Sequence, residues 1–454
     1  MSRKVNKKKA SRPTSQEPEH NVREVKHQDE QSLMALKGTS FNSLPDVSCH
    51  HFPELCTMTV APTPDVSFSA INFFLTSYLE GSNFDYLPPL YLRTSEHSPL
   101  AVTTKCVATA SLAMDMNDSQ LMNRARRQYA DALALTNTAL RSPESAILDN
   151  TLISILLLGL FETLAFEGRH SPDQWTVHTQ GAAALIRLRG KQQFETPLGH
   201  RLFLQVANYI RISSAQQKRR VPREFKSIED EAHTYMDLSN PVLGLAALTD
   251  AFTNLRADME SKSSPSHAKI VETCLEIDRQ SILLIENFPP EYRYEVLEPS
   301  KAPTWTFRGV AHRYPNIRIA LHWNAVRMIR LFTNGWIYTH SKIISRAEPD
   351  PAIDEVARSR AEIQQHAAKE VSHQMIFDIL ASIPQFTDLL STSPSPSSRF
   401  VIWPLSAVGD SPVVPPEAKA YVISCLRLLG HVSGIRQAAK AADMIEESKD
   451  LEDW

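Results

Sequence analysis

Glycine is scarce in this chain, with 13 residues in 454. Phosphate-binding loops and tight β-turns depend on glycine, because it adopts left-handed backbone conformations without steric cost. The scarcity argues against a glycine-rich α/β enzyme and against a turn-rich β-sandwich. Together with 42% hydrophobic and 22% charged residues, it predicts an all-α fold, a multi-helix array or bundle that follows a disordered, basic N-terminal tail.

Catalytic motifs are also missing. The sequence contains no G-x-S-x-G, H-E-x-x-H, P-loop or G-x-G-x-x-G pattern, so it predicts none of the sites that these motifs build. A helical enzyme of the terpene-synthase kind would need aspartate-rich metal motifs on facing helices. The nearest run, Glu229–Asp230–Glu231, lacks that spacing, and we interpret it as a solvated acidic turn. We predict a protein that is not an enzyme and has neither catalytic residues nor a cofactor.

Cysteines are few and odd in number, which is typical of a reducing compartment without a disulfide framework. Four neighbouring groups, Cys49, His50, His51 and Cys56, could in principle hold zinc. Adjacent histidines tend to point apart in an extended chain, and the spacing is not that of a standard zinc knuckle. We therefore expect a loop with two free thiols and no metal. The five cysteines are Cys49, Cys56, Cys106, Cys274 and Cys425.

No apolar run is long enough to cross a membrane. The most apolar window, residues 146–166, is interrupted by Asp149 and Glu162. Its uninterrupted part, residues 151–161, is shorter than the roughly 20 residues that a bilayer span needs. The first residues carry charges with no apolar segment behind them, so they predict no signal peptide. The window reads as a buried helix, and we expect no membrane partner.

Positive charge is concentrated at the start of the chain. Residues 1–30 carry eight Lys and Arg against five Asp and Glu, while the whole chain has a net charge of −3. The acidic remainder argues against a body-wide nucleic-acid surface. We predict that residues 1–62 form a disordered tail whose basic cluster is a nuclear import signal, a non-specific DNA contact or simply a solvated segment. The cluster consists of Arg3, Lys4, Lys7, Lys8, Lys9 and Arg12.

Helical periodicity begins at Ser67 and continues almost to the end, so we predict one helical domain over residues 63–450. Prolines and polar connectors separate the helices, a flexible loop is expected near residues 391–398, and no fixed-period repeat supports a solenoid. A second basic run, residues 218–223, is interpreted as a solvated loop with partner binding or import as its alternative. The predicted helices are 67–81, 99–116, 119–140 with Ser119 as N-cap, 143–166, 174–190, 197–216, 241–260, 267–288, 315–345, 351–383, 417–430 and 433–448.

One predicted helix, residues 174–190, is the most distinctive stretch and is called the signature helix below. Its apolar residues recur at spacings of three and four, which places them on one face towards a core. Gly181 interrupts this face at a cost of about 1 kcal/mol relative to alanine, so we expect a neighbouring helix to approach where no side chain fits. The residues of the face are Trp175, His178, Ala182, Leu185 and Ile186.

His178 lies on the same face and invites a catalytic role. It has no partner recognisable in the sequence, so we interpret it as a core residue or a hydrogen-bonding residue between helices. Arg189 and Gly190 suit the end of the helix, because a cation and a C′ glycine are favourable there. His366 and His373 are two turns apart, too far for the usual metal pair on a helix.

The pattern W-x-x-H-x-x-G-A-x-x-L-I-x-x-R-G in the signature helix resembles the fungal-specific transcription factor domain. Residues 156–162, 323–327 and 402–409 resemble further family features in the same order, and the resemblance covers roughly residues 67–430. Its signature residues are assigned to packing; they are Trp175, His178, Gly181, Ala182, Arg189 and Gly190.

The resemblance implies a nuclear regulator of RNA polymerase II transcription, whose helical domain serves regulation, effector response or dimer contacts. The DNA-binding head of that family needs six cysteines in two C-x2-C-x6-C blocks. This chain has only Cys49 and Cys56 before its body, which matches half of one block. The zinc cluster is therefore not found in this sequence.

Three classes of function follow. The first is a transcriptional regulator, as of a biosynthetic or metabolic gene cluster, that works without its own zinc cluster through its tail or through a homo- or heterodimer with another regulator. The second is a helical module that binds a small-metabolite effector or a protein, as cofactor or antagonist of a DNA-binding partner. The third is an all-α enzyme without recognisable motifs. We favour the first.

Overall fold

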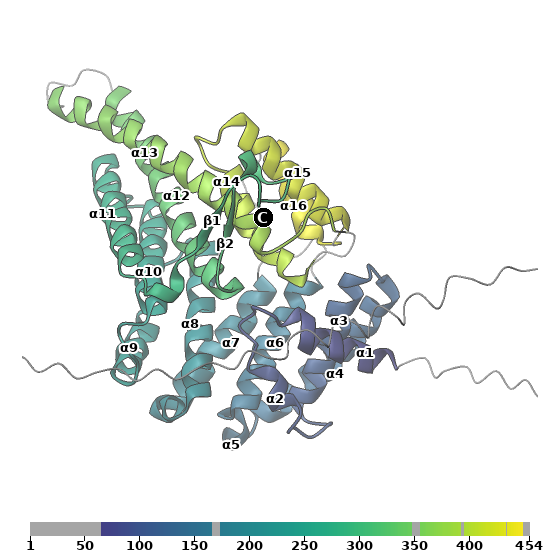
Figure 1. Ribbon diagram of the computed structural model, residues 1–454. Coiled ribbons are helices and arrows are strands. Elements are labelled where there is room, and N and C mark those ends of the chain that lie inside the picture. Colours follow the sequence, from purple (N-terminus) through teal and green to yellow (C-terminus); the bar gives the residue numbers. More distant parts are fainter. Residues whose placement is uncertain (1–64, 166–172, 347–354, 392–394, 433, 448–454) are drawn as a thin grey trace, which may run out of the picture. The chain divides into compact units, whose positions relative to one another are not determined.

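The computed structural model describes residues 65–165, 173–346, 355–391, 395–432 and 434–447. The chain separates into two units, residues 1–62 and 63–454, and all described residues belong to the second. The predicted tail, its basic cluster and the Cys49–Cys56 stretch lie outside the described residues. The described part contains sixteen α-helices and a single two-stranded sheet, which confirms the all-α fold class (Figure 1).

The first nine helices share one apolar core. Its centre is α6, whose side chains are buried on almost every side; Leu152, Ile153 and Leu157 are fully inaccessible. Helices α3, α4 and α7 pack around it, as the apolar window predicted. The bounds are α1 Val66–Phe73, α2 Leu87–Tyr91, α3 Pro99–Asp115, α4 Ser119–Leu140, α5 Pro143–Ala146, α6 Asp149–Leu164, α7 Asp173–Arg189, α8 Pro197–Gln216 and α9 Arg223–Ala232.

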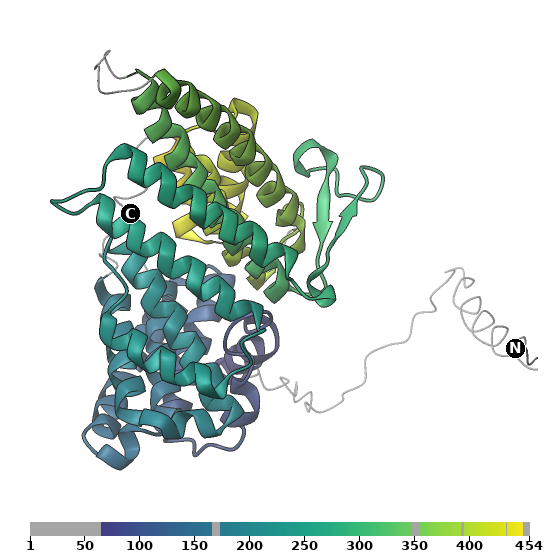
Figure 2. The same cartoon turned by 90° about the vertical axis from the view of Figure 1, so that its left-hand side faces the viewer.

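The remaining helices form two further cores. One lies between α10, α11 and α12, and the other is built from the five helices α12 to α16. The long helices α12 and α13 pack side by side and link them, and the antiparallel hairpin β1–β2 stands at one end of these helices (Figure 2). The bounds are α10 Pro241–Met259, α11 His267–Glu286, β1 Glu295–Leu297, β2 Ala311–Arg313, α12 Ile317–Arg346, α13 Glu355–Ser382, α14 Ile402–Gly409, α15 Pro416–Val432 and α16 Arg436–Glu446.

Several helices begin where a capping side chain precedes a proline. Thr196 accepts a hydrogen bond from the Gly199 N–H at the start of α8, and Asn240 does the same for α10. Proline suits the first helical position because its missing N–H would be unpaired there in any case. These starts match the predictions. For α4 the predicted cap was wrong, because Asp118 and not Ser119 accepts from the first N–H groups.

The stretch predicted as a flexible loop differs from the structure at its C-terminal end. Residues 392–394 lie outside the described residues, but Pro396–Val401 form a 3-10 helix. Ser397 and Ser398 are buried, with their hydroxyl groups hydrogen-bonded to the Phe386 carbonyl and to Thr387. Small polar side chains that resemble a linker in sequence therefore satisfy buried backbone groups here.

Candidate functional site

The signature helix is α7, which packs between α6 and α8. Ala182, Leu185 and Ile186 are buried as predicted, and Thr176 and Thr179 complete the buried face. The backbone of Trp175 lies in α7, whereas its side chain lies outside the described part of the structure. The buried face is therefore less apolar than the sequence pattern suggested.

His178 takes part in a hydrogen-bonded group that joins three helices. Its Nε2 lies 3.0 Å from the Tyr129 hydroxyl on α4 and 3.9 Å from a carboxylate oxygen of Glu162 on α6. The Tyr129 hydroxyl donates to that carboxylate, and its oxygen can accept from the histidine N–H. Burial raises the pKa of Tyr129 strongly, and the hydrogen bond to Glu162 raises it further. A phenol held in its protonated form suits positioning of the helices better than proton transfer.

Arg189 and Gly190 end the helix. The Arg189 guanidinium binds Asp149 at 2.5 Å, which joins the C-terminus of α7 to the N-terminus of α6. The negative charge of Asp149 at an N-terminus and the positive charge of Arg189 at a C-terminus both interact favourably with the dipoles of their helices. Gly190 has φ +56°, the left-handed conformation of a C′ residue.

Gly181 does not mark a close approach, and that prediction was wrong. A Cβ atom built on Gly181 would lie 4.0 Å from the nearest atom, the Ile155 Cγ2, which is an ordinary van der Waals distance. The position therefore has room for at least a methyl group.

A cluster of buried charges, which the sequence reading missed, joins α8, α9 and α10. Arg211 is 3% exposed and binds Asp250 at 2.6 Å and Glu229. Lys226 completes the cluster, 2.8 Å from Asp250. Burial alone would lower the pKa of Arg211, but Asp250 and Glu229 raise it above its ordinary value. Glu229 is thus a buried partner and not part of a solvated acidic turn, and only the tertiary contact with α8 reveals this.

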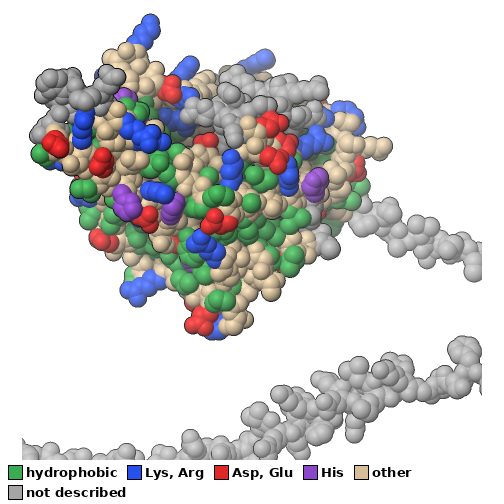
Figure 3. Space-filling model, turned by 90° about the horizontal axis from the view of Figure 1, so that it is seen from above, with side chains coloured by type: hydrophobic (Ala, Val, Ile, Leu, Met, Phe, Trp, Pro, Cys, Tyr) green, Lys and Arg blue, Asp and Glu red, His purple; other side chains and the backbone are tan. Residues whose placement is uncertain are grey.

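The second basic run also has partners on α10. Lys218 lies 3.3 Å from Glu260, and Arg220 lies 2.6 Å from Asp258. These exposed pairs contribute little to stability, but they reduce the positive charge that the run presents. Figure 3 shows a face on which acidic and basic side chains alternate with apolar ones, without a continuous basic patch.

A second buried arginine lies in the C-terminal half of the domain. Arg327 on α12 is 1% exposed, and its carbon Cζ lies 5.2 Å from the ring centres of Tyr294 and Trp323. It donates to the Tyr314 hydroxyl and to Asn324. Among the described residues its Nη2 has no hydrogen-bond partner. Aromatic rings thus surround the cation of Arg327. The buried arginine of the first half, Arg211, is paired with carboxylates instead.

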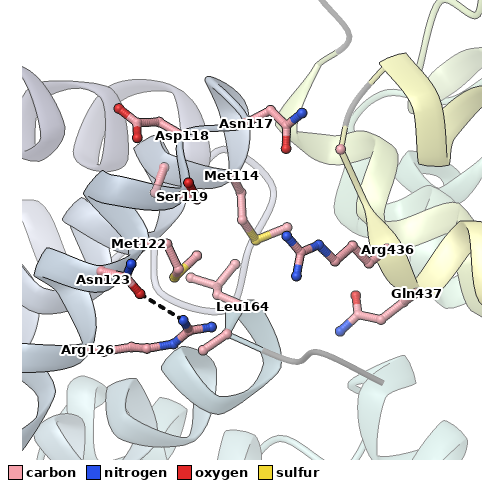
Figure 4. Close-up of a pocket in the computed structure, with 13 residues that line it drawn as sticks. Met114, Asn117, Asp118, Ser119, Met122, Asn123, Arg126, Leu164, Arg436 and Gln437 are labelled. Atoms are coloured by element: carbon pink, nitrogen blue, oxygen red, sulfur yellow. Dashed lines mark hydrogen bonds between the residues drawn. The ribbon is translucent and has the colours of Figure 1, made fainter. Parts of the chain in front are cut away.

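A pocket with a volume of about 190 Å³ opens where the α3–α4 turn and the end of α6 meet the start of α16 (Figure 4). Gln437 on α16 donates to the Thr163 carbonyl on α6 at 2.8 Å, which bridges one side. The lining residues are Ala113, Met114, Asn117, Asp118, Ser119, Met122, Asn123, Arg126, Leu164, Ala165, Gly434, Arg436 and Gln437.

The pocket combines an apolar floor with a cationic rim. Met114, Met122 and Leu164 supply the apolar part, while Arg126 and Arg436 extend into the pocket from α4 and α16 (Figure 4). Residues that far apart in the sequence gave no local pattern, so the pocket could not be predicted. Its lining combines apolar, polar and charged side chains.

The described ranges offer little support for a metal site, a membrane span or a reactive thiol. No group of three or more His, Cys, Asp and Glu is placed to hold a metal ion there, and no helix there is long and apolar enough to cross a membrane. The three described thiols are buried, and burial raises the pKa of Cys274 and of Cys425 to about 12. Such thiols stay protonated near neutral pH and are poor nucleophiles.

Of the residues singled out in the sequence, His178, Gly181, Ala182 and Arg189 lie along α7, and Gly190 follows its last residue. They do not line the pocket. The basic cluster lies outside the described residues; it consists of Arg3, Lys4, Lys7, Lys8, Lys9 and Arg12.

Comparison with known proteins places this helical body in context. Residues 67–279, from α1 into α11, match the profile of the fungal specific transcription factor domain. The chain is also 25% identical to the transcription factor dbaG of Emericella nidulans over 391 residues, which is 78% of this chain and 84% of that protein. No solved structure matches the chain significantly. Domain and relative are both those of transcriptional regulators, and residues 67–279 of this chain are similar to the fungal specific transcription factor domain.

Proposed function

We propose that this transcriptional regulator acts in the nucleus through its helical domain, without a zinc cluster of its own, on genes of a biosynthetic or metabolic cluster. The observation that carries the proposal is the domain match over residues 67–279, together with an interior in which the buried charges form structural contacts. A nuclear location follows from that role, since a transcriptional regulator acts where the genes are.

These 454 residues hold no pair of C-x2-C-x6-C blocks, so in this proposal contact with DNA comes from another source. The sequence offers the basic tail for non-specific phosphate contacts. Sequence-specific reading would come from a second regulator with which this chain forms a dimer. The net charge of −3 favours a role for a partner over direct binding by the body.

A reporter assay tests the proposed regulation. The full chain is fused to an unrelated sequence-specific DNA-binding domain, and transcription from a reporter that carries its site is measured. We expect the reporter level to change relative to the DNA-binding domain alone. A fusion that reaches the promoter by chromatin immunoprecipitation but leaves transcription unchanged would contradict the proposal.

The tail needs a separate experiment. Deletion of residues 2–12 should reduce nuclear accumulation of the tagged chain if the cluster is an import signal. The matched control deletes residues 13–22, a stretch of similar length in the same tail that contains no Lys or Arg. Unchanged distribution of the deletion variant would remove the import role from the tail.

A second function, a helical module that binds an effector or a protein and acts as cofactor or antagonist of a DNA-binding partner, is favoured by the pocket at the start of α16. The two functions differ in the tethered assay. A cofactor or antagonist alters transcription only when its partner is present, whereas an autonomous regulator does so alone.

A further inference from the structure

We propose that residues 355–374, the first part of α13, pair with the same helix of a second copy of this chain. The two helices run antiparallel about a two-fold axis beside Gln365. This inference names one partner for the regulator of the proposed function and rests on that function only in its consequence for transcription. The surface that carries it, called the α13 stripe below, consists of Arg360, Ile363, Ala367, Glu370 and Gln374.

The α13 stripe has the spacing of a seam between two helices. Its residues follow one another at alternating steps of three and four, which keeps them on one side of the helix. All five are exposed, and Ile363 is 70% exposed. A single exposed isoleucine is ordinary at a protein surface, so the inference depends on the charges that surround it.

Another side of the same part of α13 packs against its own chain. Ala361 and Ala368 are each 2% exposed and Ser372 is fully buried, because α13 packs along α12 there. The α13 stripe is turned away from this contact. The start of α13 also lies at the end of the domain away from the first core (Figures 1 and 2), so a second copy can approach it without meeting that core.

One antiparallel register matches the α13 stripe to itself. A two-fold axis makes every contact occur twice, with the two residues exchanged between the copies. With the axis beside Gln365, Arg360 faces the partner's Glu370. Ile363 faces the partner's Ala367 in the same arrangement. The pairing therefore contains two ion pairs on either side of two apolar contacts.

Other arrangements of the same two helices match poorly. A shift of one heptad sets Arg360 against the partner's Ile363, or Glu370 against the partner's Ala367, and each of these contacts desolvates a charge without a counter-charge. A parallel pair sets like charges opposite each other, which is unfavourable. The charges of the α13 stripe thus select the antiparallel register.

The two charged residues are available for such contacts. Within the described part of the chain, neither Arg360 nor Glu370 forms a salt bridge or a side-chain hydrogen bond. Exposed ion pairs contribute little to affinity, but complementary charges fix the register of an interface and suppress wrong partners. The ion pairs therefore supply specificity, while burial of Ile363 supplies part of the affinity.

The size of the contact predicts a weak dimer. Residues 355–374 span about 30 Å at the helical rise of ~1.5 Å per residue. A single pair of helices of that length buries less surface than most stable dimers do, so we expect a reversible equilibrium between monomer and dimer. A dimer carries the basic cluster of residues 3–12 twice, and phosphate contact by one copy then raises the effective concentration of the other.

The test is sedimentation velocity of the purified full chain over a wide range of concentrations. We expect the wild type to shift from monomer to dimer as the concentration rises. Arg360→Glu and Glu370→Arg should each weaken self-association by at least about tenfold, because each sets two pairs of like charges opposite each other. Both positions are exposed, so the melting temperatures of the variants should equal that of the wild type.

A mixture of the two variants tests the register. Arg360→Glu carries two acids in the α13 stripe and Glu370→Arg carries two bases, so a mixed dimer regains both ion pairs. An equal mixture should therefore associate as the wild type does, although neither variant associates alone. The matched controls are Lys369→Glu and Glu362→Arg, charge reversals at exposed positions of α13 outside the stripe, which should leave self-association unchanged.

Three results overturn the proposal. The first is a wild-type chain that remains monomeric at every concentration. The second is a dimer that charge reversal in the α13 stripe weakens no more than charge reversal at the control positions. The third is a mixture that fails to associate when both variants have lost self-association, since this excludes the antiparallel register.

The tethered reporter separates this inference from the proposed function. A monomeric chain that still changes reporter transcription overturns the pairing and leaves the regulator intact. A chain that dimerises through the α13 stripe but produces no reporter response supports the pairing and contradicts the regulatory function.

Discussion

The two halves of the domain each bury an arginine and stabilise it differently. In the first half Arg211 is matched by the carboxylates of Asp250 and Glu229. In the second half Arg327 lies among aromatic rings, with neutral hydrogen-bond acceptors and one N–H group unpaired. The difference indicates that Arg211 is stabilised mainly by charge balance, whereas Arg327 is stabilised mainly by aromatic packing.

The largest expected effect is that of Arg211→Met. Removal of the guanidinium leaves Glu229 and Asp250 buried with only Lys226 as counter-charge, which should destabilise the fold by about 3–5 kcal/mol. Thermal or urea unfolding measures it. Arg220→Met, which removes an exposed pair with Asp258, is the control and should cost about 1 kcal/mol or less. Similar losses of stability in both variants would show that the buried cluster contributes no more than an exposed ion pair.

Arg327→Met should cost less than Arg211→Met, about 1–3 kcal/mol. The variant leaves the Tyr314 hydroxyl and the Asn324 carbonyl without a donor. Arg327 forms no ion pair among the described residues, although the charge of Asp378 acts on it from nearby. The methionine side chain can fill the space between the rings. A loss equal to that of Arg211→Met in the same unfolding experiment would contradict the distinction between the two halves.

The second half should also lose stability on mild acidification. Burial lowers the pKa of His312 to about 3 and that of His322 to about 4, below the ordinary value of about 6.5. Both are neutral in the folded state, so the unfolded chain binds more protons below pH 6.5. Stability contributed by the neutral rings is complete above that pH and falls as the pH drops towards 4.

The measurement is the melting temperature between pH 7.5 and pH 5. His322→Gln retains an acceptor for the Tyr292 hydroxyl, which lies 2.9 Å from the His322 Nδ1, and should reduce the dependence on pH. His97→Gln, an exposed position, is the control. An unchanged profile in His322→Gln would show that burial of this histidine is not the cause.

The smallest expected change in stability is that of a substitution in the signature helix, and it is a gain where the other variants lose stability. Gly181→Ala adds a methyl group where 4.0 Å of space is available, and alanine is the better helix former by about 1 kcal/mol. We expect a gain in stability of up to ~1 kcal/mol by thermal unfolding. A loss would mean that α6 and α7 approach more closely than the distance to Ile155 indicates.

The sequence predicted most helices because their boundaries are encoded locally. Thr196–Pro197 and Asn240–Pro241 start α8 and α10 at the predicted residues, and the apolar residues of α6 predicted its central position. The same reasoning missed α9 and the hairpin β1–β2, since ten polar-rich residues and two strands of three residues carry little periodic signal.

The sites were less predictable than the helices. His178 was expected to bond between helices, but nothing in the sequence pointed to Tyr129 or Glu162 as its partners. Glu229 reads as a surface residue until Arg211 is brought beside it by the packing of α8 and α9. The pocket depends on the contact between α6 and α16 through Thr163 and Gln437, and a tertiary contact of this range leaves no periodic trace.

The most direct measurement is the urea unfolding of Arg211→Met beside that of Arg327→Met at neutral pH. The account predicts the larger loss of stability in Arg211→Met, because this variant leaves the buried carboxylates of Glu229 and Asp250 with Lys226 as their remaining counter-charge. An equal or larger loss in Arg327→Met would contradict the claim that the two buried arginines are stabilised differently.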